Sequence, residues 1–134
     1  MKDNVIMDKS YDFALRTAKL YLFLREEKKE FEMSKQILRS GTSIGANVEE
    51  AIGGQSRKDF ASKLGIAYKE ARETKFWLRL LTDTKLITPA VSSSMLNDCE
   101  ELLRILGSIL KTIRRGRSEN TTEQNLEFTS IPNS

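Results

Sequence analysis

The sequence has no histidine and only one cysteine, Cys99, among its 134 residues. Without histidine, the chain lacks the usual general base, the commonest metal ligand and the group that activates a serine or cysteine nucleophile. A structural zinc site is not expected, because such sites are built mainly from cysteine and histidine. A single cysteine cannot form a disulfide within the chain and fits a reducing cytoplasm. These absences predict a protein that is not an enzyme and that uses no cofactor, although they leave carboxylate chemistry at Glu50, Glu70 or Glu73 as an alternative.

Proline and glycine are also scarce, with two and seven residues respectively. The chain has no run of about 18 apolar residues, so no transmembrane helix is expected. Its first residues lack the apolar core of a secretion signal, which predicts a cytoplasmic location. Apolar residues make up 39% and charged residues 31%, and leucine, glutamate, lysine and arginine are abundant. This composition predicts an all-α fold.

Hydrophobic periodicity predicts four amphipathic helices, at about residues 8–28, 33–52, 57–84 and 89–115. Ser56 suits the N-cap of the third helix, and Pro89 suits the first position of the fourth. Short connections between helices of this length predict an antiparallel up-down four-helix bundle over residues 1–115. The periodicity then stops, and residues 116–134 are predicted to be a disordered polar tail.

The first helix carries apolar residues on two nearly opposite sides. One stripe consists of Phe13, Leu20 and Leu24. The other consists of Tyr11, Ala14, Leu15, Ala18, Tyr21 and Leu22. A helix that packs on one side needs only one such stripe. We therefore expect one side to be covered by the bundle and the other by a second subunit.

The stretch "RSGTSIGANVEEA", Arg39 to Ala51, could be a phosphate-binding loop or part of a helix. A phosphate-binding loop needs the pattern G-x-x-x-x-G-K after a strand, whereas Gly41 and Gly45 are four residues apart and no lysine follows them. The stretch is therefore interpreted as a helix. Each glycine inside a helix costs about 1 kcal/mol relative to alanine. Close packing of another helix against Gly41 and Gly45 would offset that cost.

A polar row flanks the apolar face of this second helix, at Gln36, Ser40, Ser43, Asn47 and Glu50. We interpret the row as a set of hydrogen-bonding groups that fix the register of neighbouring helices, with a ligand site as the alternative. Asn47 and Glu50 are expected to be at least partly buried. Glu73, with Glu70 beside Trp77 on the third helix, is expected to pair with a basic or amide group at a helix contact.

Positive charge is segregated on the third helix. Its cations fall within about a third of the helix circumference: Arg57, Lys58, Lys69, Arg72, Lys75 and Arg79. A second cluster, Lys111, Arg114 and Arg115, lies at the predicted end of the fourth helix. One interpretation is a nucleic-acid-binding surface that faces phosphates. The other is a solvated face, with the second cluster complementing the helix dipole.

Two stretches resemble a known family: "LRSGTSIGANVEEA" and the following "SRKDFASKLGIAYKEARETKFWLRLL". They resemble the four-helix-bundle proteins encoded in intervening sequences of bacterial 23S rRNA genes. That family is similar to the accessory variability-determinant proteins of diversity-generating retroelements. The resemblance extends from about Tyr11 to Arg115. It implies a ring-like homopentamer and, in the retroelement members, a basic surface that binds nucleic acid and a reverse transcriptase.

These observations predict a non-catalytic, oligomeric four-helix-bundle module. Its expected partners are further copies of itself, RNA or DNA, and a nucleic-acid enzyme such as a reverse transcriptase, with no membrane. The alternative is a structural or protein-interaction oligomer that does not bind nucleic acid. The resemblance implies no catalytic residues.

Overall fold

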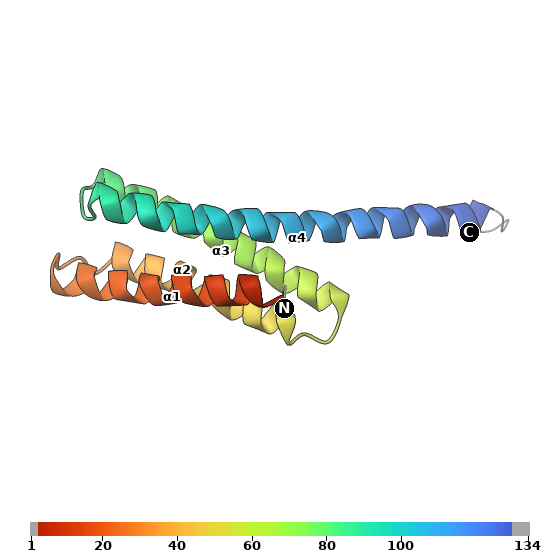
Figure 1. The fold of residues 1–134 in the computed structure, drawn as a ribbon, viewed down its shortest axis with the longest axis horizontal. Helices are drawn as coiled ribbons and strands as arrows, with labels where there is room; N and C mark the ends of the chain where they lie inside the picture. The colour runs from red at the N-terminus through yellow and green to blue at the C-terminus, as the bar shows by residue number, and fades with distance from the viewer. Residues whose placement is uncertain (1–2, 130–134) are drawn as a thin grey trace.

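The computed structural model describes the backbone of residues 3–129 and the side chains of residues 5–116. Over that range the only regular secondary structure is α-helix, with no strands, so the all-α prediction is confirmed. The helices are α1 (Asp3–Glu26), α2 (Met33–Ile52), α3 (Arg57–Asp83) and α4 (Pro89–Thr129). Figure 1 shows consecutive helices running in opposite directions, as in a four-helix bundle. None of the helices in the described part is long and apolar enough to cross a membrane.

The largest difference from the predicted helices is the length of α4. The periodicity placed its end near Arg115, whereas the helix continues to Thr129. After Gly116 the sequence is polar, but it contains no proline before Pro132, so nothing in it forces the helix to stop. Figure 1 shows α4 projecting well beyond the other three helices. Residues 130–134 of the predicted tail lie outside the described residues.

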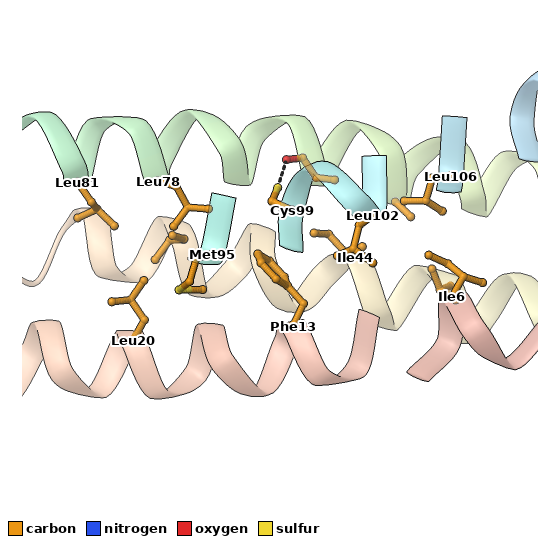
Figure 2. Packing of buried hydrophobic residues seen from close by; sticks show 14 of the residues in the cluster. Ile6, Phe13, Leu20, Ile44, Leu78, Leu81, Met95, Cys99, Leu102 and Leu106 are labelled. Carbon is orange, nitrogen blue, oxygen red and sulfur yellow. Dashed lines mark hydrogen bonds between the residues drawn. The ribbon is translucent and has the colours of Figure 1, made fainter. Parts of the chain in front are cut away.

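The apolar core fills the space between the four helices, and Figure 2 shows its packing. From α1 it takes the stripe containing Phe13, which is 1% exposed. The opposite stripe faces outward, with Tyr11, Leu15 and Leu22 exposed by 62%, 47% and 51%. The bundle therefore covers one of the two predicted apolar sides of α1 and leaves the other open on the single chain.

Polar side chains bridge α1 and α4. Lys9 Nζ donates to Glu101 Oε1 at 3.2 Å, and Arg16 donates to Asp98. Arg16 also donates to Ser94 Oγ at 2.9 Å. Because these groups are partly exposed to water, such pairs add little to the free energy of unfolding. The seam between α1 and α4 thus depends mainly on the core beneath it.

Cys99 belongs to this core and is completely buried. Its thiol donates to the Ala71 carbonyl oxygen, with Sγ 3.2 Å from the oxygen. Burial is the main cause that raises the pKa of the Cys99 thiol to about 12. Since the thiolate is the reactive form, we expect Cys99 to resist an aromatic disulfide reagent at mildly alkaline pH and to react fully once denatured. Rapid reaction of the folded protein would contradict the packing of α4 against α3.

Candidate nucleic-acid interface

The stretch from Arg39 to Ala51 lies wholly inside α2, so it is not a phosphate-binding loop. Helix α1 packs directly against both of its glycines. A Cβ atom on Gly41 would lie 2.6 Å from Thr17 Cγ2, and one on Gly45 would lie 3.1 Å from the Ser10 carbonyl oxygen. The predicted close approach is thus confirmed at both positions. The glycines serve the contact between α1 and α2.

The middle of the polar row on α2 lies inside the protein. Ser40 is fully buried and accepts a hydrogen bond of 2.9 Å from Thr74 Oγ1 on α3. Asn47 is 9% exposed, and its amide donates to the Ser43 carbonyl and hydroxyl at 2.8 and 3.0 Å. Asn47 therefore bonds within its own helix, whereas Ser40 links α2 to α3 by a buried hydrogen bond.

The two ends of the same row face solvent. Gln36 is exposed, and so is Glu50, whose side chain is 60% accessible. Glu50 forms an ion pair of 3.6 Å with Lys63 on α3. The prediction that Glu50 is at least partly buried is therefore wrong, although it does contact the neighbouring helix. Glu50 lies near the end of α2, where its carboxylate stays exposed to solvent and hydrated.

Glu70 and Glu73 on α3 share one cation, Arg39 of α2. Arg39 donates to Glu70 Oε2 at 3.2 Å and to Glu73 Oε2. Glu73 also accepts a hydrogen bond of 3.1 Å from Trp77 Nε1. The expected pairing of these acids with a basic group is confirmed, and Arg39 is the partner that sequence reasoning missed. Both carboxylates therefore hold α2 against α3, which is a structural role.

The outer surface between α3 and α4 is a groove, which we call the α3/α4 groove. It consists of two hollows of about 630 and 650 Å³ that meet at Tyr68 and Gly107. Cations from both helices line it: Lys58, Arg72, Lys75, Arg79, Arg104, Lys111 and Arg114. The fold thus joins the two basic clusters, which are separate in the sequence, into one surface.

The lining of the α3/α4 groove includes one acid, Glu100. Lys75 Nζ lies 2.7 Å from Glu100 Oε1, and this hydrogen bond is the main cause that lowers the pKa of Glu100. Glu100 therefore stays ionised and neutralises Lys75. The other six cations leave the groove strongly positive, which suits a polyanion.

Three of the predicted cations do not line the groove. Arg57 lines a separate, smaller hollow, whereas Lys69 and Arg115 lie exposed elsewhere on their helices. Sequence reasoning in turn missed Arg104, which lies two helical turns before Lys111 on α4. That spacing was the available signal, because residues seven apart lie on nearly the same side of a helix.

An exposed aromatic ring accompanies the cations. Phe76 lines the groove, is 52% exposed, and packs edge-on against Trp77 with 5.0 Å between ring centroids. A ring held in place beside cations can stack on a nucleobase while the cations hold the phosphates. The arrangement therefore provides both kinds of contact that a single nucleic-acid strand uses.

Comparison with known proteins agrees with the resemblance noted in the sequence. A family model described as 23S rRNA-intervening sequence protein matches residues 2–108. The chain belongs to this family. The match covers α1, α2, α3 and the part of α4 that carries Arg104, so most of the groove lies within the family domain. No curated protein matches the chain.

A solved structure supports the same family assignment. It is the crystal structure of a protein of unknown function from the S23 ribosomal protein family of Bacteroides thetaiotaomicron VPI-5482. The two chains are 58% identical and superpose with a TM-score of 0.81, over 83% of this chain and 99% of that one. The resemblance to the intervening-sequence family is thus confirmed, while the relation to retroelement proteins stays a prediction.

Proposed function

We propose that this family member is a non-catalytic module that binds nucleic acid along the α3/α4 groove. The observation that carries the proposal is the convergence of cations from two helices on one groove, where Glu100, the one acid among the described lining residues, is already paired. Binding of phosphates by lysine and arginine releases counterions, which drives association and makes it sensitive to salt. Phe76 adds a ring on which a base can stack.

We also propose that the chain works as a homo-oligomer, for which the family resemblance suggests a ring-like pentamer. The outward stripe of α1, with Tyr11, Leu15 and Leu22, offers an apolar surface for contact between subunits. Each subunit would add one groove, so a modest net charge of +3 per chain becomes a multivalent surface. We place the protein in the cytoplasm. The resemblance to retroelement accessory proteins also suggests a reverse transcriptase as a protein partner.

The test is binding of fluorescently labelled RNA, single-stranded DNA and duplex DNA over a series of salt concentrations. We compare the double variant Arg72→Glu, Arg79→Glu with the control Lys69→Glu, Lys35→Glu. Both variants change the net charge equally, but only the first alters residues that line the groove. We expect the groove variant to bind at least about 100-fold more weakly at low salt, and the control to lose only a few-fold.

Two outcomes would contradict the proposal. The first is no binding of any of the three nucleic acids at low salt, and the second is equal loss in both double variants. A second candidate function, a structural or protein-interaction oligomer, is favoured by the exposed apolar stripe on α1. An oligomer in solution that binds no nucleic acid would support this second function.

A further inference from the structure

A hollow of different character lies at the end of the bundle where α1 ends and α3 joins α4. Its volume is about 820 Å³, which is within the range of small-molecule sites. Leu20, Ile87 and Met95 are almost fully buried at its floor, with 6%, 6% and 2% exposure. Phe23 and Val91 also line it and are 42% and 39% exposed. Figure 2 shows Leu20 of α1 and Met95 of α4 close together in the core, and both residues line this hollow.

The charged residues that line this hollow all have the same sign. They are Arg16, Lys19, Lys28 and Lys85, and no aspartate or glutamate of the described part of the chain lines the hollow. Arg16 is already bonded to Asp98 and Ser94. The three lysines form no ion pair within the described side chains, 5–116. An apolar surface edged by unneutralised cations is complementary to a ligand with an apolar body and an anionic head.

The backbone at Lys85 determines how this lysine is placed at the hollow. Helix α3 ends in a turn in which Lys85 N–H donates to the Thr82 carbonyl at 2.9 Å and Leu86 N–H donates to the Leu81 carbonyl at 3.0 Å. This Schellman turn needs a left-handed residue, usually glycine, and here Lys85 adopts it with φ of 63°. A side chain at that position is disfavoured. The turn therefore fixes where the Lys85 side chain starts, at the edge of the hollow.

We propose that this hollow binds a small amphipathic anion, namely an alkyl or aromatic carboxylate. Its apolar body lies on Leu20, Ile87 and Met95, and its carboxylate lies among Lys19, Lys28 and Lys85. None of these residues lines the α3/α4 groove, so the site is separate from the proposed nucleic-acid interface. The positive rim selects the charge of the ligand, and the volume of the hollow selects its size.

The first experiment compares two probes with the same alkyl chain and opposite charge. Decanoate and decyltrimethylammonium are each titrated into the full-length protein by calorimetry, below their micelle concentrations. We expect decanoate to bind one site per chain with a Kd below about 1 mM, and the cationic probe to bind at least about tenfold more weakly. Absence of decanoate binding, or equal binding of the two probes, would overturn the proposal.

The second experiment uses two matched glycine substitutions. Lys29 also adopts a left-handed conformation, with φ of 53°, but it does not line the hollow. Both Lys85→Gly and Lys29→Gly remove one charge and relieve the backbone, so both are expected to keep or raise the Tm. We expect Lys85→Gly to weaken decanoate binding about fivefold and Lys29→Gly to leave it unchanged. Equal effects of the two substitutions on decanoate binding would place the anion elsewhere.

Discussion

Gly41→Ala is expected to lower the free energy of unfolding by about 1–3 kcal/mol, even though alanine favours a helix by about 1 kcal/mol over glycine. The new Cβ would lie 2.6 Å from Thr17 Cγ2 and 2.7 Å from Thr17 Oγ1. Thr17 cannot turn away freely, because it is fully buried and its hydroxyl donates to the Phe13 carbonyl at 2.8 Å. The clash must therefore displace α1 from α2. Urea unfolding at fixed protein concentration measures the change.

Gly65 supplies the matched control for this substitution. It lies inside α3, and a Cβ added there would have no described atom within 4 Å apart from its chain neighbours and the nearby backbone of α3. Gly65→Ala is therefore expected to raise the free energy of unfolding by up to about 1 kcal/mol, through helix propensity alone. Adding Thr17→Ala to Gly41→Ala should recover part of the loss, since it removes the two closest contacts. A stabilised Gly41→Ala variant would contradict the close packing of α1 on α2.

The helices and the close contact at the glycines could be predicted because they depend on local patterns. Ser56 caps α3 as expected, with its hydroxyl oxygen accepting from the Asp59 N–H at 3.0 Å. The four-residue spacing of Gly41 and Gly45 places them on one side of α2. Because glycine has no side chain, another helix can pack closely against that side. The end of α4 was harder to predict, because a polar sequence without proline is compatible with both helix and tail.

The surfaces could not be predicted, because they depend on how each helix is rotated against its neighbours. Arg39 lies on α2, yet the two acids that it pairs with are on α3, more than 30 residues away. Likewise, the spacing of Arg104 and Lys111 places both on one side of α4, but packing of the whole core decides that this side meets the basic side of α3. The prediction for Glu50 failed for a similar reason, since helical spacing gives the direction of a side chain and does not show where a covering helix ends.

Phe13→Ala is expected to have the largest effect on stability, a loss of about 3–5 kcal/mol in the free energy of unfolding. Phe13 is 1% exposed, and Figure 2 shows it pointing from α1 into the centre of the bundle, near Ile44 and Cys99. Removing the ring leaves a cavity that well-packed neighbours can fill only in part. Denaturant unfolding followed by circular dichroism measures the loss. A chain of this size could be largely unfolded by it, because total stabilities are about 5–15 kcal/mol.

Tyr11 lies on the opposite side of the same helix and provides the control for Phe13→Ala. Because it is 62% exposed, Tyr11→Ala is expected to change the unfolding free energy of the single chain by less than about 0.5 kcal/mol. If the outward stripe joins subunits as proposed, the same substitution shifts the mass in solution toward smaller species. The comparison is made at protein concentrations where the chain is monomeric. If Phe13→Ala and Tyr11→Ala then destabilised the protein equally, the orientation of α1, with Phe13 inward and Tyr11 outward, would be contradicted. A wild-type chain that is monomeric at micromolar concentration would contradict the proposed contact between subunits, since the outward stripe would then face water with no partner.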